Sequence, residues 1–350
     1  MLPNLRAFIR INMVNWVGMD EAGIDGGGIF KEFLCEVIKT ALDPSRGLFA
    51  ATKDHFLYPN PSASTIYPND FQDHFYFVGR LIGKLIYEKL LIDVRFADFF
   101  IVQSFKSFDT NLLDLEYIKT YDSQLHANLK FLKDCSPEEV NSLDLDFSIL
   151  TDNLGVLQKI DLKKNGSEIK VNAENRSEYI SLYVNYLISK LEPMICAFKA
   201  GIRNVIDPGW LRIFSATEIG ALIGGLDADI DVNDLKNHTK VHNIKCKNFA
   251  KKPADDDLLY MDNFWLLIND LPSAQKQLLL KFITGCSRPP LMGFKALYPP
   301  MGIQLIHDSD GLPTAATCLS LLKLPVYKDT TTLASKLNMA INSNAGFELS

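Results

Sequence analysis

The sequence predicts a mixed α+β fold in two parts: a larger, mostly helical N-terminal part with a small α/β subdomain, and a smaller α/β C-terminal part. The chain has 350 residues, of which 47% are hydrophobic, and this is enough material for two cores. Apolar residues recur at helical spacing in both parts, and short strand-like segments interrupt them. A polar and charged stretch over residues 234–257 indicates a junction between the two parts.

Composition argues against several classes of protein. A formal net charge of -6 disfavours a nucleic-acid surface as the main function, and no apolar run approaches membrane-spanning length. The six cysteines form no Cys-x-x-Cys pair and no close His/Cys cluster, so neither a disulfide framework nor a zinc site is indicated. We therefore expect a protein of a reducing compartment, the cytoplasm and also the nucleus, without a metal, a cofactor, a nucleic-acid partner or a membrane.

The first predicted elements are a glycine-rich turn at residues 23–28 and a helix that begins in the apolar stretch 29–34. A phosphate-binding loop is the weaker interpretation of the glycines, because no Lys-Ser/Thr pair follows them and no clear strand precedes them. The segment is therefore predicted to be a tight turn that caps the helix.

A long helix is predicted over residues 71–86, because its apolar residues recur at helical spacing. Asn69 or Asp70 is the expected N-cap. Gly79 and Gly83 lie one turn apart in this helix, and their missing side chains leave room for another element to pack closely.

Between about residues 116 and 190 the pattern predicts a small α/β subdomain. A helical segment over 125–132 is followed by short strand-like segments, and the Asn165-Gly166 pair is typical of a tight hairpin turn. A further helix, which Ser177 can cap, carries tyrosines at positions 179, 183 and 186. Aromatic residues on such a helix usually belong to a core, but tyrosine is also enriched on recognition surfaces.

The C-terminal part is predicted to contain one strand and three helices. Residues 303–307 alternate between apolar and polar side chains, which indicates the strand. The helices are predicted over residues 264–268, 275–284 and 331–342. His238 and His242 stand four residues apart before these elements, but no glutamate or apolar helix face accompanies them, so a polar linker is favoured over a zinc site.

The most informative residue is Cys318, which ends the segment Leu-Pro-Thr-Ala-Ala-Thr-Cys at residues 312–318. The Leu-Pro step disfavours a helix before it, and the hydroxyl groups of Thr314 and Thr317 can hold an open loop. A cysteine nucleophile needs exposure and a means of forming the thiolate. No histidine lies beside Cys318, the nearest upstream being His307, so these residues alone favour a buried structural cysteine.

Six segments of the chain match one set of motifs in order. They are Asp-Glu-Ala-Gly-Ile-Asp-Gly-Gly-Gly at 20–28, Leu-Tyr-Pro-Asn-Pro at 57–61, Phe-Val-Gly-Arg-Leu-Ile-Gly-Lys at 77–84, Phe-Ile-Thr-Gly-Cys-Ser-Arg-Pro-Pro at 282–290, the segment 312–318, and Gly-Phe-Glu-Leu-Ser at 346–350. By these motifs the chain resembles the HECT domain of ubiquitin-protein ligases, particularly the branch with Gly-Ile-Asp-Gly-Gly-Gly near its start. They cover nearly the whole chain, so the combination is highly specific.

The resemblance implies a bilobal HECT-like fold and a ubiquitin-protein transferase that works through a cysteine thioester. An N-terminal lobe at 1–236 would dock a ubiquitin-charged conjugating enzyme, and a hinge at 237–243 would connect it to a C-terminal catalytic lobe at 244–350. Cys318 would accept ubiquitin as a thioester and pass it to a lysine amine of a protein substrate. Exchange of one thioester for another is nearly balanced, so the main task of such an enzyme is orientation.

The resemblance also implies roles for individual residues. Thr317 would support the shape of the nucleophile's loop or an oxyanion, and Phe347 would be the tail aromatic that positions the lobes or ubiquitin. The subdomain at about 116–190 would bind the conjugating enzyme. The residues expected to form its apolar groove are Leu129, Phe131, Leu132, Tyr179 and Tyr183.

Three features depart from the family pattern. Ala316 stands where many members have a histidine two residues before the cysteine, so no imidazole there can act as a base. Residues 239–243 replace a Tyr-x-Gly-Gly-Tyr-like run at the hinge, which bears on its flexibility. The usual first helix is missing, because the match begins near Leu5, and we expect a fragment whose first lobe is less stable.

Two other functions compete with transfer. A catalytically silent domain would bind conjugating enzyme or ubiquitin without forming a thioester, and the short start and altered hinge are consistent with it. A papain-like hydrolase would have its cysteine early in the chain and a histidine after it, but no histidine follows Cys318. The hydrolase is therefore the weaker alternative.

Overall fold

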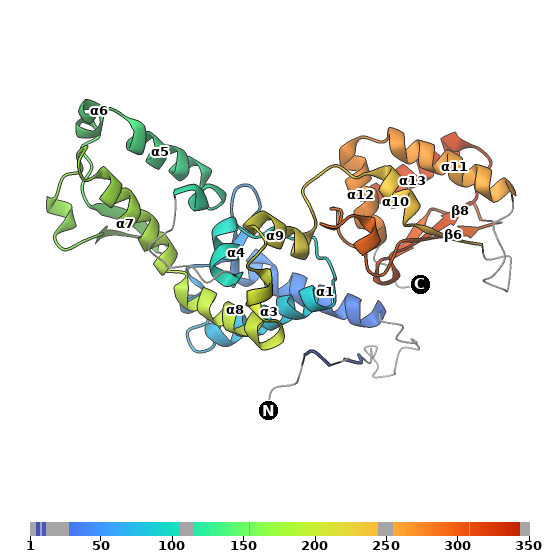
Figure 1. Cartoon of the computed structure of the whole chain (residues 1–350), viewed down its shortest axis with the longest axis horizontal. Helices are drawn as coiled ribbons and strands as arrows, with labels where there is room; N and C mark the ends of the chain where they lie inside the picture. Colours follow the sequence, from blue (N-terminus) through green and yellow to red (C-terminus); the bar gives the residue numbers. More distant parts are fainter. Residues whose placement is uncertain are drawn as a thin grey trace. The chain divides into compact units, whose positions relative to one another are not determined.

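The computed structural model describes residues 5–7, 9–11, 28–105, 115–153, 155–243, 255–307 and 309–343. Helices and three small sheets alternate along these residues (Figure 1), which confirms the predicted mixed α+β class. The glycine-rich turn before residue 28 and Phe347 lie outside the described residues. In the described part, no helix is long and apolar enough to cross a membrane.

Contacts divide the chain into two compact units that alternate along the sequence. The helical unit holds residues 38–84 and 94–217, and the sheet unit holds the residues up to 37, residues 85–93 and those from 218 onward. These boundaries differ from the predicted lobes at 1–236 and 244–350, because residues 218–236 and two earlier segments group with the C-terminal residues. The two-lobe division with its hinge stays a prediction.

The helical unit is built around three helices and a short two-stranded sheet. Its elements outside the subdomain are η1 (Pro44–Arg46), β1 (Phe49–Ala51), β2 (Leu57–Pro59), α2 (Ala63–Ile66), most of α3 (Phe71–Tyr87), α4 (Asp98–Phe105), α8 (Glu192–Val205) and η5 (Pro208–Leu211). The predicted helix over 71–86 is therefore confirmed as α3. Buried phenylalanines fill the centre, where the rings of Phe100 and Phe198 lie 4.9 Å apart.

Two glycines of α3 bring it close to α8, as the sequence predicts. A Cβ atom added at Gly79 would lie 2.1 Å from the carbonyl oxygen of Phe198, and one added at Gly83 would lie 3.1 Å from Cβ of Val205. A contact of 2.1 Å is impossible for a side chain, so only glycine at position 79 allows this helix packing.

The predicted α/β subdomain lies within the helical unit and has a core of its own. Its elements are η3 (Leu115–Thr120), α5 (Ser123–Asp134), α6 (Pro137–Ser142), β3 (Ser148–Asn153), β4 (Val156–Asp161), η4 (Gly166–Glu168) and α7 (Arg176–Ser189). Asp122 caps α5, because its carboxylate accepts hydrogen bonds from the backbone N–H groups of Gln124 and Leu125. The helix predicted over 125–132 is therefore confirmed.

Two local predictions in the subdomain are wrong in position. Strands β3 and β4 pair as a hairpin with Asn153 opposite Val156, so the turn contains Gly155 and not the Asn165-Gly166 pair. Asn165 does adopt the left-handed conformation, with φ 54°, but it starts η4 after the hairpin. The Asn165-Gly166 pair correctly predicts a left-handed backbone conformation, but it does not identify which two strands form the hairpin. Helix α7 begins at Arg176, after Asn175 and not after Ser177.

The sheet unit contains a four-stranded sheet with helices packed on it. The strands are β5 (Lys240–Asn243), β6 (Gly302–Ile306), β7 (Thr314–Ala316) and β8 (Leu321–Pro325), in the order β5-β6-β8-β7. Strands β5, β6 and β8 are parallel, and β7 is antiparallel to β8. The other elements are α9 (Ala216–Gly224, most of it in this unit), α10 (Val232–Asn237), α11 (Asp255–Asp270), α12 (Ser273–Thr284), η6 (Phe294–Ala296), η7 (Thr317–Leu319) and α13 (Thr330–Asn342).

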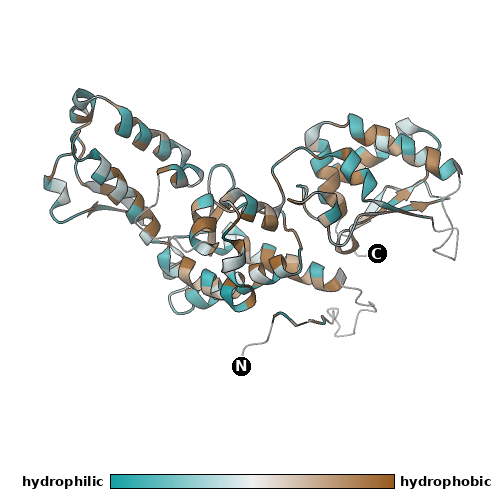
Figure 2. Cartoon of the chain, in the orientation of Figure 1, coloured by the Kyte–Doolittle hydropathy of each residue, from teal (hydrophilic) through white to brown (hydrophobic). Residues whose placement is uncertain are grey.

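Helices α11 and α13 lie on one side of this sheet (Figure 1). Their inward residues and those of α12 join the strands in one core that includes Phe264, Leu279, Ile303 and Leu333. Figure 2 shows both hydrophobic and hydrophilic residues along these helices, as expected for helices with one buried face. The strand predicted over 303–307 and the three predicted helices are thus confirmed.

The segment predicted as a hinge, 237–243, has regular structure. Asn237 ends α10, and Lys240–Asn243 form β5, which pairs with β6 along its whole length. Val241 packs against the core of the sheet unit, so the segment behaves as an edge strand. A hinge at 237–243 is therefore a prediction that would require this pairing to open.

Candidate active site around Cys318

Cys318 lies in a tight turn between two neighbouring strands. Strand β7 ends at Ala316, the 3-10 helix η7 spans Thr317–Leu319, and β8 begins at Leu321. The thiol is free and half-buried. The sequence predicts an open loop over 312–318, whereas Thr314–Ala316 form β7, because the edge of β8 offers backbone partners to these residues.

Backbone hydrogen bonds fix both ends of the turn. Ser320 adopts the left-handed conformation with φ 51° and is fully buried, and its N–H donates to the carbonyl oxygen of Thr317 at 3.3 Å. The carbonyl oxygen of Ser320 accepts a hydrogen bond from the N–H of Gly302 on β6 at 2.9 Å. A non-glycine residue in this conformation is uncommon and requires support from its surroundings. The turn that carries the sulfur is therefore held in one shape.

Lys31 of α1 (Gly28–Leu42) contacts this turn. Its Nζ donates to the carbonyl oxygen of Thr317 at 2.9 Å, to that of Thr284 at 3.3 Å, and to Oγ of Ser320 at 3.5 Å. Residues 31 and 317 both belong to the sheet unit. Sequence reasoning missed Lys31, since nothing local relates positions 286 residues apart.

The surroundings of Cys318 disfavour its thiolate on balance. Burial and the nearby carboxylate of Glu32 raise the pKa of the Cys318 thiol, while Lys31 opposes them. A raised pKa means that most of the thiol is protonated at neutral pH. Removal of its proton is therefore part of any reaction in which this sulfur attacks.

His307 does not act as a base for Cys318. The residue follows β6, and the strand starts at Gly302, opposite Leu321 near the turn. Five residues of strand place His307 about 16 Å further along the sheet. Its Nε2 instead lies 3.4 Å from Oδ1 of the buried Asp257. His307, the nearest upstream histidine in the sequence, therefore does not lie beside Cys318.

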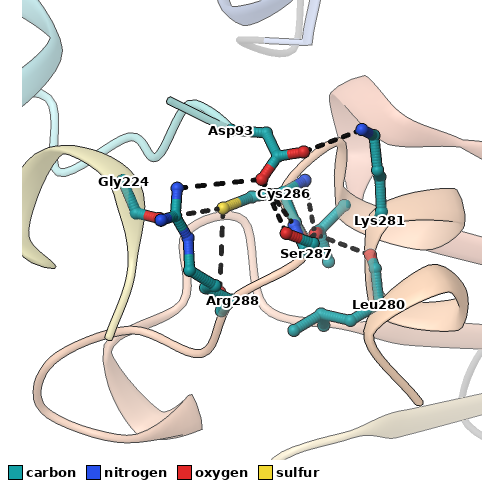
Figure 3. A network of polar contacts seen from close by, with 8 residues as sticks. Asp93, Gly224, Leu280, Lys281, Cys286, Ser287 and Arg288 are labelled. Carbon is teal, nitrogen blue, oxygen red and sulfur yellow. Dashed lines mark hydrogen bonds and ion pairs between the residues drawn. The ribbon is translucent and has the colours of Figure 1, made fainter. Parts of the chain in front are cut away.

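A second polar network holds the residues that follow α12 (Figure 3). The carboxylate of Asp93 accepts a hydrogen bond from Oγ of Ser287 at 2.6 Å and pairs with Nζ of Lys281 at 2.8 Å. Arg288 lies 3.8 Å from the same carboxylate. Burial opposes ionisation, but the hydrogen bonds from Lys281 and Ser287 lower the pKa of Asp93. The network therefore fixes Ser287 and Arg288, which closely follow Thr284, whose carbonyl oxygen accepts a hydrogen bond from Lys31.

Cys286, inside this network, is a structural cysteine. Its sulfur lies 3.6 Å from the carbonyl oxygen of Gly224 and 3.7 Å from that of Arg288 (Figure 3). Burial raises the pKa of this thiol to about 11. Among the other described cysteines Cys135 is buried, Cys35 is half-buried on α1, and Cys196 is exposed on α8. Within the described ranges, no three His, Cys, Asp or Glu residues are placed to hold a metal ion.

The five residues predicted to bind the conjugating enzyme do not share one surface. Leu129, Leu132 and Tyr179 are buried in the core of the subdomain, with 4%, 2% and 5% of their surface exposed. Tyr179 packs edge-on against Phe147, with ring centroids 5.5 Å apart. These three side chains therefore cannot line an open groove, because the core of the subdomain needs them.

The remaining two residues are accessible to different degrees. Phe131 is 52% exposed on α5, and Tyr183 is half-buried on α7. The hairpin adds Leu150 and Leu157, which are 72% and 73% exposed and which sequence reasoning missed. Leu157 pairs with Asp152, two residues from Leu150, so both leucines lie on one face of the hairpin.

Known proteins resemble the chain over nearly its whole length. The family model described as HECT-domain (ubiquitin-transferase) matches residues 35–350. E3 ubiquitin-protein ligase etc-1 of Caenorhabditis elegans is 43% identical over 99% of this chain and 34% of its own length. Human Ubiquitin-protein ligase E3B is 36% identical over 99% of the chain and 34% of its own length, and mouse E3 ubiquitin-protein ligase NEDD4 is 33% identical over 95% and 36%.

The chain spans about a third of the length of these relatives. Their alignments nevertheless include almost every residue of this chain, and the family model covers all of it from residue 35. The chain therefore belongs to the HECT family, the ubiquitin-transferase domains of ubiquitin-protein ligases.

Proposed function

We propose that this chain is the catalytic domain of a ubiquitin-protein ligase, with Cys318 as its nucleophile. It would accept ubiquitin from a charged conjugating enzyme as a thioester and transfer it to a lysine amine of a protein substrate. The observation that carries the proposal is a free, half-buried thiol on a fixed turn, in a chain that belongs to this family. The buried position of Cys286 and Cys135 argues against them as alternatives.

Two displacements at a carbonyl carbon make up the reaction. The Cys318 thiol first loses its proton, and its thiolate attacks the thioester carbonyl, so that a new C–S bond forms while the conjugating enzyme's thiolate leaves. The substrate amine then attacks the Cys318 thioester, an amide bond forms, the Cys318 thiolate leaves, and the amine gives up a proton. The first step exchanges like bonds, so orientation of the two partners dominates its rate.

The proposal gives Thr317 and Phe347 supporting roles. The carbonyl oxygen of Thr317 is engaged by Lys31 and by the N–H of Ser320, which supports a role in the shape of the turn. The hydroxyl of Thr317 is also a candidate donor to the oxyanion. Phe347 is proposed to position the lobes or ubiquitin, on the basis of its place in the tail motif.

We place the conjugating-enzyme surface on the exposed side of the subdomain. Phe131, Leu150 and Leu157 are large apolar residues with more than half of their surface exposed; Phe131 lies on α5, and the two leucines share one face of the β3–β4 hairpin. Exposed apolar side chains of this kind are typical of protein-binding sites. Tyr183 is retained from the predicted set, whereas Leu129, Leu132 and Tyr179 support the surface from beneath.

Transfer requires that Cys318 face a donor and then an acceptor. A bend within 237–243 would break the pairing of β5 with β6. Residues 225–229 form no helix or strand, but the N–H of Leu226 donates to the carbonyl oxygen of Pro289 at 2.7 Å and ties this segment to the sheet unit. We therefore keep the proposed hinge at 237–243, where movement would require β5 to leave β6.

The proposal is tested by incubating the chain with charged conjugating enzyme and separating the products on a non-reducing gel. The expected product is a ubiquitin adduct that disappears with excess thiol and is absent in Cys318→Ala. Cys196→Ala is the matched control, because it removes an exposed cysteine from α8 and should keep the adduct. An adduct that persists in Cys318→Ala would exclude Cys318 as the nucleophile, and binding without any adduct would indicate a catalytically silent domain.

A further inference from the structure

Lys31 occupies a core position of α1. It lies on the same face as Leu34 and Ile38, three and seven residues on, and the three are 6%, 1% and 0% exposed. A lysine is rarely buried unless its charge is paired, because desolvation of an ammonium group is unfavourable by several kcal/mol. A lysine in the apolar face of a helix therefore needs an explanation.

Among the residues that the structure describes, Lys31 donates its hydrogen bonds to uncharged oxygens and not to a carboxylate. The three recorded acceptors are the carbonyl oxygens of Thr317 and Thr284, at 2.9 and 3.3 Å, and the hydroxyl oxygen of Ser320 at 3.5 Å. Three acceptors match the three N–H bonds of the group. All three oxygens are uncharged, so these contacts satisfy its donors, and none of them brings a carboxylate to the ammonium group.

The same three acceptors define the turn that carries Cys318. Thr317 precedes the cysteine, Ser320 closes the turn in its left-handed conformation, and Thr284 ends α12 beneath it. One side chain thus connects both ends of the turn to a helix terminus. Loss of Lys31 would leave buried carbonyl oxygens without this donor.

The charge of Lys31 acts on a small group of thiols. Burial lowers the pKa of Lys31, and Cys35, Cys318 and Cys286 oppose that shift. Cys286 has a pKa of about 11 and stays protonated at neutral pH. Cys318 faces two opposite charges from successive residues of α1, since Glu32 disfavours its thiolate and Lys31 favours it.

We propose that Lys31 is a positioning residue for Cys318, which fixes the turn through Thr317 and Ser320 and presents a positive charge to the sulfur. It serves the electrostatic purpose of a histidine in a chain where Ala316 occupies the usual histidine position. The inference rests on the proposed role of Cys318 as nucleophile. The proton of Cys318 passes to solvent in this scheme, and Lys31 keeps its own.

The experiment measures alkylation of Cys318 by iodoacetamide between about pH 7 and 11.5, a range chosen because burial raises the pKa of this thiol, with the modified peptides quantified by mass spectrometry. In Lys31→Met, which keeps the length of the side chain, the midpoint of the Cys318 profile is expected to rise by about 0.5 to 1 pH unit. Alkylation at pH 7.5 then slows about 3- to 10-fold. Glu32→Gln should move the midpoint in the opposite direction, and Cys196 in the same samples should be unchanged.

Ubiquitin loading separates this role from a merely structural one. Loading by Lys31→Met is expected to fall about 3- to 10-fold at pH 7.5 and to approach the native rate only as the pH exceeds the raised midpoint of Cys318. A structural defect would not recover with pH. Lys31→Arg keeps the charge and should retain the native midpoint, and it replaces Lys31→Met if the latter does not fold.

An unchanged Cys318 midpoint in Lys31→Met, or a raised midpoint in folded Lys31→Arg, would overturn the inference. If the proposed function is wrong, the experiments give a different result. The native chain would then form no Cys318 adduct with ubiquitin, although the alkylation profile would still depend on Lys31.

Discussion

The thiols of Cys318 and Cys286 lie in the same unit, but their surroundings give them different chemistry. Cys286 contacts the carbonyl oxygens of Gly224 and Arg288 and is buried, which raises its pKa to about 11. Cys318 lies on a turn and is half-buried. At the scale of single residues, exposure and nearby charge distinguish a candidate nucleophile from a packing residue.

Asp93 makes a testable contribution to stability. Its folded pKa is lowered, so its contribution to folding is present above the unfolded pKa near 4 and is lost as the pH falls through the lower, folded value. Asp93→Asn is expected to reduce the free energy of unfolding at pH 7 by about 1–3 kcal/mol. Urea titrations at pH 7 and pH 3 should show a smaller difference between variant and native protein at the acid pH. An equal loss at both pH values would contradict an ionic role.

At the scale of elements, helix packing depends on single glycines. Gly79→Ala would place a Cβ atom 2.1 Å from the carbonyl oxygen of Phe198, so α3 and α8 must separate. We expect a loss of at least 2 kcal/mol, on the order of an overpacked core. Thermal or urea unfolding measures it. Gly311→Ala is the matched control, since its nearest atom lies 3.4 Å away on an exposed loop, and an equal loss there would remove the packing explanation.

The β3–β4 hairpin has two exposed leucines, which are proposed to contact the conjugating enzyme. Leu150→Asp and Leu157→Asp are expected to leave the free energy of unfolding within about 0.5 kcal/mol of native, because both side chains are on the surface. They should raise the conjugating-enzyme concentration needed for half-maximal loading about 10-fold, as expected for hot-spot residues. Leu266→Asp, on α11 and 65% exposed, is the matched control. Equal effects of all three changes would contradict a specific surface.

At the scale of the whole molecule, features that depend on nearby residues could be predicted from the sequence, whereas features that depend on tertiary contacts could not. The helices α3, α5, α12 and α13 and the strand β6 depend on local periodicity, and the sequence predicts them well. The partner of a strand and the inward face of a helix depend on tertiary packing. Local sequence could therefore not predict the hairpin turn at Gly155 or the burial of Leu129.

The site shows the same limit. Cys318 could be predicted as the nucleophile because its motif is contiguous, but the turn conformation at Ser320 depends on β6 and on α1. The contact of Lys31 with Thr317 spans 286 residues. One local signal did exist, since a lysine stood among apolar residues at helical spacing, and such a position indicates either a charge partner or a buried contact.

That separation has a consequence for biosynthesis. A ribosome adds about 5–20 residues per second, so roughly 15–60 s pass between the synthesis of Lys31 and that of Thr317, whose carbonyl oxygen it binds. During this interval the lysine remains hydrated, and residues 28–37 have no completed sheet unit to join. The turn that carries Cys318 can therefore form its contact with Lys31 only after Thr317 has been made, which delays this contact until most of the domain has been synthesised.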